Sequence, residues 1–113
     1  MKNKTIDNVA VEYGTGNVYA DLGVADADKQ KIKSGLTIEI IKSLRRLGLT
    51  QAEAGKRMGI SQAKVSNLFR GDFTNLSERK LMDCLNRLGC DIEIVIRPSS
   101  SETGQLRLAQ SRP

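Results

Sequence analysis

Residues 50–70 combine two short helical patterns with a glycine-containing turn, and this combination restricts the fold more than any other feature of the chain. Thr50 and Glu53 have the spacing of a capping box, in which each side chain bonds the other residue's backbone amide at the start of a helix. Gly59 ends that helix, and Ser61 offers a cap for a second one. The pattern predicts two helices that meet at a steep angle across a short turn.

Such a crossing makes demands on packing, and the sequence meets them. The first helix needs a small residue where the second helix crosses it, which Gly55 supplies. The turn needs a residue that tolerates a left-handed backbone, which Gly59 supplies. Phe69 is expected to face inward with the apolar residues that hold the crossing together, which are Ala54, Met58, Ile60, Val65 and Leu68.

Further helices are expected on both sides of this pair. Before it, Asp26 and Asp28 place negative charge at a helix start, and Gly48 stops that helix. Its apolar face repeats at helical spacing, at Ile32, Leu36, Ile40, Leu44 and Leu47. After the pair, Ser77 caps a helix that carries on one face Leu81, Leu85 and Leu88.

The hydrophobic period changes after the last helix. Residues 91–97 alternate isoleucine with other residues and end at Pro98, which predicts a β-strand. On one face this strand carries Ile92, Ile94 and Ile96. A lone strand has nowhere to place its hydrogen bonds, so we expect it to pair with the same strand of a second copy, or alternatively within the chain near residues 17–19. The fold class is therefore mainly α, a domain of four to five helices with one C-terminal strand used in dimerisation.

The chain of 113 residues is expected to form one domain with a segment outside the fold at each end. Residues 1–16 are polar and are interpreted as a flexible arm, and residues 17–98 form the folded domain. Residues 99–113 open with three serines and hold few apolar residues, which predicts a disordered tail.

Composition argues against several classes of function. The chain has no histidine, the commonest general base, and no nucleophile–base pair can be assembled, so we expect no catalytic residue. Cys84 and Cys90 are too few for a disulfide framework or a zinc site, and no metal or cofactor is expected. The apolar runs are short and the amino terminus lacks a secretory pattern, so a cytoplasmic protein with no membrane partner is expected. The net charge of +5 is compatible with a nucleic acid.

Three runs within the central region carry a resemblance to a known family. The Thr-Gln-Ala-Glu opening at residue 50, the Gly-Ile-Ser turn at residue 59 and the Val-Ser-Asn-Leu-Phe-Arg-Gly close at residue 65 resemble the Cro/phage-repressor (XRE-type) class of helix-turn-helix proteins. The likeness is most specific over residues 50–71 and extends over residues 26–88. It implies a homodimeric, sequence-specific repressor whose partner is double-stranded DNA, with its second helix in the major groove of a palindromic operator.

The exposed side of the second helix supplies the candidate DNA contacts. Gln62 can pair with adenine, and Ala63 can touch a thymine methyl group. Lys64 and Arg70 are candidates for phosphate contacts. In the family pattern, the glutamine at the start of the first helix donates to a phosphate. The whole predicted DNA-binding set is Gln51, Ser61, Gln62, Ala63, Lys64, Ser66, Asn67 and Arg70.

Two flanking segments carry a narrower resemblance. Residues 17–23 and 91–98 resemble the HigA-like antitoxins of bacterial toxin–antitoxin modules. This implies an antitoxin that regulates its own operon and binds a RelE/HigB-like toxin. Two alternatives stay open, a stand-alone phage-type repressor without a toxin and a toxin-neutralising interaction module with little DNA binding.

Overall fold

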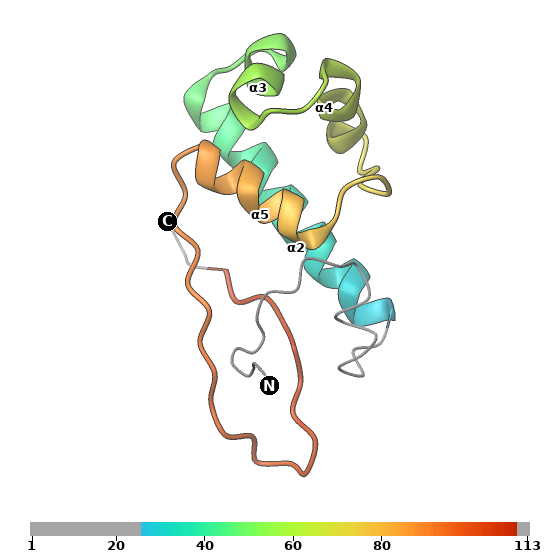
Figure 1. Ribbon diagram of the computed structural model, residues 1–113, viewed down its shortest axis with the longest axis vertical. Coiled ribbons are helices and arrows are strands. Elements are labelled where there is room, and N and C mark those ends of the chain that lie inside the picture. Colours follow the sequence, from blue (N-terminus) through green and yellow to red (C-terminus); the bar gives the residue numbers. More distant parts are fainter. Residues whose placement is uncertain (1–25, 111–113) are drawn as a thin grey trace, which may run out of the picture.

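The computed structural model describes residues 26–110, and this part of the chain is mainly helical (Figure 1). Its helices are α2 (Asp26–Leu47), α3 (Gln51–Met58), α4 (Gln62–Phe69) and α5 (Glu78–Arg87). The expected helical domain is therefore confirmed. The flexible arm predicted for residues 1–16 lies outside the described residues.

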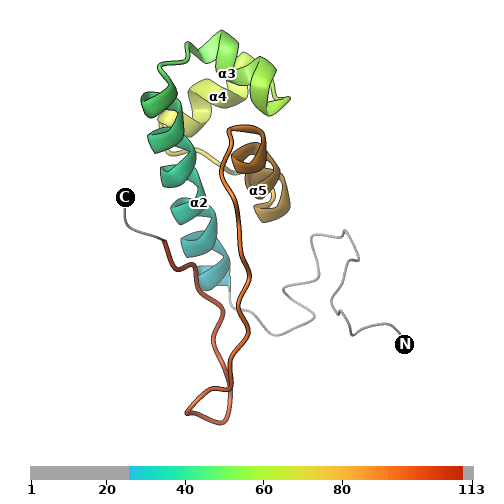
Figure 2. The same ribbon diagram turned by 90° about the vertical axis from the view of Figure 1, so that its left-hand side faces the viewer.

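The long helix α2 is the element on which α5 packs (Figures 1 and 2). Its first turn holds Asp26 and Asp28 and its last turn holds Arg45 and Arg46, so the charges complement the helix dipole at both ends. Gly48 follows with a φ of 68°, a left-handed conformation that ends the helix. The predicted apolar face is buried at Ile32, Leu36, Ile40 and Leu44, while Leu47 is 37% exposed.

Each of the three shorter helices begins at the predicted side-chain cap. The side chains of Thr50, Ser61 and Ser77 accept a hydrogen bond from the amide three residues later, over 3.1, 3.2 and 3.0 Å respectively. These bonds satisfy backbone donors that the first turn of a helix leaves without partners. The helix starts are therefore specified by short stretches of local sequence.

The strand predicted for residues 91–97 does not form in the described part of the chain. Ile92 packs against the core, whereas Ile94 and Ile96 are 76% and 91% exposed. A strand requires a hydrogen-bonded neighbour, and no backbone bond joins residues 91–97 to another described segment. The sequence prediction of a strand is thus not confirmed for one chain alone, and the alternative partner near residues 17–19 lies outside the described residues.

Beyond residue 98 the chain turns back, and residues 105–110 run beside α2 (Figures 1 and 2). Leu108 packs against the core next to Gly35, and Gln110 donates a hydrogen bond to the carboxylate of Glu39. The sequence predicts a disordered tail for residues 99–113, but Leu108 places part of this segment against α2. The helical pattern of α2 alone does not reveal that contact, because it depends on a residue far away in the sequence.

Candidate nucleic-acid interface

The crossing of α3 and α4 depends on a close backbone approach at Gly55. A Cβ atom at this position would lie 2.8 Å from the carbonyl oxygen of Ile60, which is too close for any side chain. The Gly55 carbonyl in turn accepts hydrogen bonds from the amides of Gly59 and Ile60, at 2.8 and 3.0 Å. Gly59 has a φ of 74°, in the left-handed region. Both sequence predictions for these glycines are confirmed.

Apolar side chains close the seam between the two helices. Ala54, Met58, Val65 and Leu68 are fully buried, and Ile60 is half-buried, as predicted. Phe69 was expected to face inward but is 37% exposed. Phe69 lies four residues after Val65 and so shares its face, but it is the last residue of this short helix, and no further turn of α4 follows to cover it.

The first turn of α4 presents polar groups to solvent at the end of the molecule opposite the C-terminal segment (Figure 1). Ser61, Gln62, Ala63 and Lys64 are all exposed. The Ser61 hydroxyl accepts the Lys64 amide, and the remaining free amides of a helix start form a positive pole that suits a phosphate. Four of the predicted DNA contacts therefore lie together on one accessible turn.

Three further predicted contacts are joined by side-chain hydrogen bonds at the other end of α4. The Arg70 guanidinium donates to the Ser66 hydroxyl over 2.8 Å and to the side-chain oxygen of Asn67. Ser66 and Asn67 are half-buried, and Arg70 is exposed. The bond from Arg70 orients the Asn67 amide, whose NH₂ group remains a potential donor.

Gln51 is the first residue of α3 and is half-buried. Beside it, the Thr50 amide donates to the Glu53 carboxylate over 2.9 Å, while the Thr50 hydroxyl accepts the Glu53 amide over 3.1 Å. These bonds with Thr50 hold the pKa of the Glu53 carboxyl below its ordinary value. Gln51 is thus placed at a firmly capped helix start, where the family pattern expects a phosphate donor.

The loop after α4 places beside this surface residues that the sequence analysis did not include among the candidate contacts. The Asp72 amide donates to the Asn67 carbonyl over 2.8 Å, and the Asp72 carboxylate accepts two hydrogen bonds from Thr74. Those bonds from Thr74 lower the pKa of Asp72. Asn75 lines a small hollow together with Lys64 and Asn67, so the loop lies directly beside α4. The turn-forming run Gly-Asp-Phe-Thr-Asn after α4 is the signal that could have indicated it.

The cations near the interface divide into two groups. The Arg57 side chain donates to the carbonyl of Arg87 over 3.2 Å, so this α3 residue caps the end of α5. Lys56, Lys64 and Arg70 are exposed. Arg57 is exposed as well, but its guanidinium group is held at the end of α5.

The two cysteines differ in exposure, since Cys84 is buried and Cys90 is half-buried. Burial raises the pKa of the Cys84 thiol, and the Cys90 sulfur lies 3.2 Å from the Ser43 hydroxyl. Within residues 26–110, no three His, Cys, Asp or Glu side chains gather closely enough to hold a metal ion. None of the described helices combines the length and hydrophobicity required to cross a bilayer.

Comparisons with known proteins agree with this geometry. Residues 18–97 match the family described as helix-turn-helix domain. A solved structure described as an XRE family transcriptional regulator superposes with a TM-score of 0.70 at 34% identity, covering 79% of this chain and 100% of that one. The chain belongs to the XRE-type helix-turn-helix family. This family is non-enzymatic, in agreement with the expectation from the sequence. No curated protein matches this XRE-type chain.

Proposed function

We propose that this XRE-type protein is a DNA-binding transcriptional regulator, a repressor, that inserts α4 into the major groove. The observation that carries the proposal is the division of α4 into two faces. Val65 and Leu68 are fully buried, while Gln62 and Lys64 are exposed on a turn held in place by the crossing at Gly55. A rigid helix with a polar free face is the arrangement that direct reading of base pairs requires.

A salt-resolved titration against the protein's own promoter DNA tests this function. With about three phosphate contacts per chain, a dimer is expected to show a log–log salt slope on the order of −5. The Lys64→Ala variant should reduce the steepness of that slope, and Arg57→Ala should reduce it less because the Arg57 side chain is held at the end of α5. Affinity that does not change between low and physiological salt would contradict DNA binding by this surface.

Tight and selective binding requires two copies, because one recognition helix covers too little DNA. We therefore propose a homodimer on a palindromic operator with half-sites about 34 Å apart. The contact surface is the run at residues 91–97, in which Ile94, Val95 and Ile96 are 76%, 62% and 91% exposed. Three successive exposed apolar residues are expected to be covered by a partner.

The dimer contact is tested with the Ile94→Pro variant. Proline removes a backbone donor and constrains φ, so it breaks strand pairing while sparing the distant helices. The expected product is a helical monomer with operator affinity close to its non-specific level, measured by sedimentation, circular dichroism and DNA titration. Ser100→Pro, in the same exposed segment but outside the apolar run, is the control. If the Ile94→Pro protein stays dimeric, the dimer contact lies on another surface of the chain.

The narrower proposal is that this regulator is the antitoxin of a type II toxin–antitoxin module. It is supported by the resemblance of residues 17–23 and 91–98 to HigA-like antitoxins and by the exposed apolar run. Co-purification with the product of an adjacent gene, followed by a test of that product's RNA-cleaving activity, decides it. An adjacent RelE/HigB-like toxin neutralised by this protein supports the proposal, and the lack of any toxin in the operon leaves a stand-alone repressor. A toxin complex without affinity for promoter DNA would instead mark a pure interaction module.

A further inference from the structure

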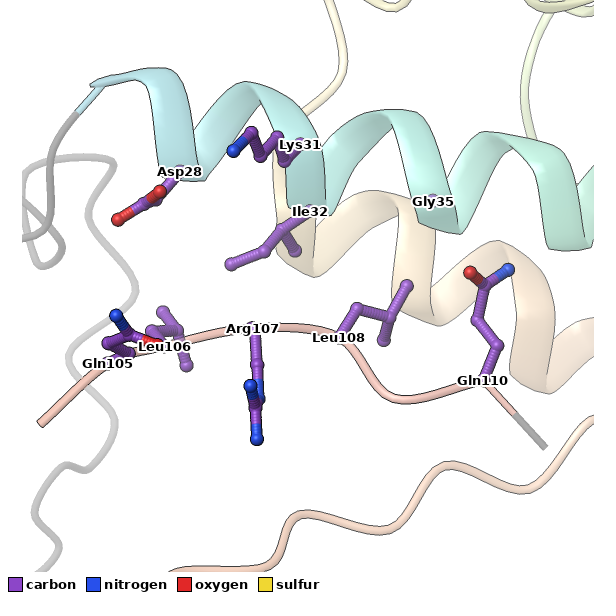
Figure 3. A pocket seen from close by; sticks show the side chains of 9 residues that line it. All are labelled: Asp28, Lys31, Ile32, Gly35, Gln105, Leu106, Arg107, Leu108 and Gln110. Atoms are coloured by element: carbon purple, nitrogen blue, oxygen red, sulfur yellow. The ribbon is translucent and has the colours of Figure 1, made fainter. Parts of the chain in front are cut away.

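Gly35 stands in the middle of α2, where glycine weakens a helix relative to alanine. A Cβ atom at position 35 would lie 2.7 Å from the terminal carbon Cδ2 of Leu108. The glycine therefore keeps open a slot on the surface of α2 that a leucine side chain enters. Figure 3 shows Leu108 pointing toward the helix at this place, with Ile32 one turn away.

The segment that carries this leucine fills its site on α2 only in part. A groove of about 340 Å³ lies between residues 105–110 and α2, lined on the helix side by Asp28, Lys31 and Ile32 (Figure 3). Leu108 is partly buried, and Gln110 donates a hydrogen bond to Glu39. Such a contact is specific because of the Gly35 slot, yet it involves few groups and is easily exchanged.

The connection from the helices to this segment is long and exposed. Cys90 is anchored by Asn86, whose side chain donates to the Cys90 carbonyl over 3.0 Å. From residue 93 to residue 107 every side chain is exposed. The side-chain hydrogen bonds described within this stretch join residues 99, 101 and 103 to one another. Extended, residues 91–104 reach about 45 Å, which is enough to span to a neighbouring copy.

We propose that the Gly35 slot receives Leu108 from a second copy of this chain, so that two copies exchange residues 105–110. The exchange keeps the same contact, so relative to the closed chain it costs mainly the entropy of association, which the newly covered apolar residues offset. It also brings the two 91–97 runs together about a two-fold axis, which covers Ile94 and Ile96. This inference rests on the dimer proposed above and deepens it, because it names the segment that each copy supplies to the other.

Cross-linking between two differently substituted chains tests the exchange. One chain carries Glu39→Cys, the other carries Gln110→Cys, and both carry Cys90→Ser to remove the half-exposed thiol. The two chains carry different affinity tags, are co-expressed at full length and are treated with a short bismaleimide. In the exchanged dimer, the E39C position of one chain lies beside the Q110C position of the other.

A cross-link at dimer mass that contains both tags supports the exchange, provided that mixtures lacking either substituted chain show none. A doubly substituted E39C/Q110C chain that cross-links only within itself, at monomer mass, overturns it. If that result comes with a protein that sediments as a dimer and binds operator DNA, the exchange fails while the proposed regulator stands.

A matched pair of variants gives a second measurement. The flexible end of Leu108 can move away from a single added methyl group, so a larger side chain is needed to close the slot. Gly35→Leu fills it and keeps a good helix former in α2, so the fold is retained while the dimer dissociation constant rises by roughly tenfold. Ser34→Ala, at the neighbouring position, should leave dimerisation unchanged. Equal dimerisation of the two variants would contradict a role for the slot between copies.

Discussion

The guanidinium group of Arg70 donates a hydrogen bond to the hydroxyl of Ser66 over 2.8 Å, one turn back along α4. The same group donates to the side-chain oxygen of Asn67. Three residues predicted separately as DNA contacts thus form one bonded unit on the recognition helix. Arg70 therefore both contributes charge and fixes which end of the Asn67 amide faces outward.

Arg70→Lys and Arg70→Ala should separate these two roles of Arg70. Lysine keeps the charge but lacks the planar fork that holds two partners at once. Arg70→Lys should therefore retain non-specific affinity and lose discrimination between operator and random DNA, whereas Arg70→Ala should lose both. Competition titrations at one salt concentration measure the ratio. An Arg70→Lys protein with wild-type discrimination would show that the bonded unit does not orient Asn67.

Gln62 is expected to read a base. Its exposed amide at the first residue of α4 is free to bond the edge of adenine. Gln62→Ala should cost roughly 1–3 kcal/mol per half-site on operator DNA while leaving non-specific binding nearly unchanged. Lys64→Ala is the contrasting control, since loss of a phosphate contact weakens both kinds of binding. Equal losses on both DNAs for Gln62→Ala would exclude a reading role.

Gly55→Ala should destabilise the domain in spite of alanine's higher helix propensity. The added Cβ would lie 2.8 Å from the Ile60 carbonyl oxygen, so α4 must shift, at a cost of about 1–3 kcal/mol. Urea unfolding measures this cost, and operator titration should show a parallel loss as α4 moves. Ala52→Gly, at an exposed position of the same helix, should lose only roughly 0.5–1 kcal/mol. A Gly55→Ala domain as stable as wild type would mean that the crossing has room for a side chain.

The capping box at α3 should make the free energy of unfolding decrease at acidic pH. Hydrogen bonds with Thr50 lower the pKa of folded Glu53 below its ordinary value of 4.5. The stabilisation is therefore complete above 4.5 and is lost as the pH falls through the lowered pKa. Glu53→Gln still accepts the Thr50 amide but cannot titrate, so its free energy of unfolding should fall less between pH 7 and pH 3. Unfolding curves at both pH values measure this difference, with Glu102→Gln in the exposed C-terminal segment as control. Identical pH dependence in wild type and Glu53→Gln would contradict it.

The helices and the α3–α4 crossing were predictable because their determinants are local. The cap at Ser61 and the left-handed Gly59 act within three or four residues, and the apolar spacing around Val65 and Leu68 reports one helix face. The same spacing predicted which residues of α4 are exposed, namely those at its first turn. Phe69 was misplaced because position on a helix end, and not hydrophobicity alone, decides how much of a side chain is covered.

What the sequence did not predict depends on contacts between distant residues. The approach of Leu108 to Gly35 and the bond from Arg57 to the end of α5 each join separate parts of the chain. The strand predicted at residues 91–97 illustrates the same limit. The alternating isoleucines indicate one apolar face that should be covered, but they do not indicate which segment pairs with the strand. Where that neighbour is a second copy, no single chain contains it.

The caps at Thr50, Ser61 and Ser77 have a consequence for the order of folding. Each closes a loop of only a few residues, so its entropy cost is small and the three short helices can begin within about a microsecond. The packing of α5 on α2 joins the first and the last of the described helices and therefore closes the longest loop between helices. We expect that docking step to limit the folding rate, with local helix starts already formed when it occurs.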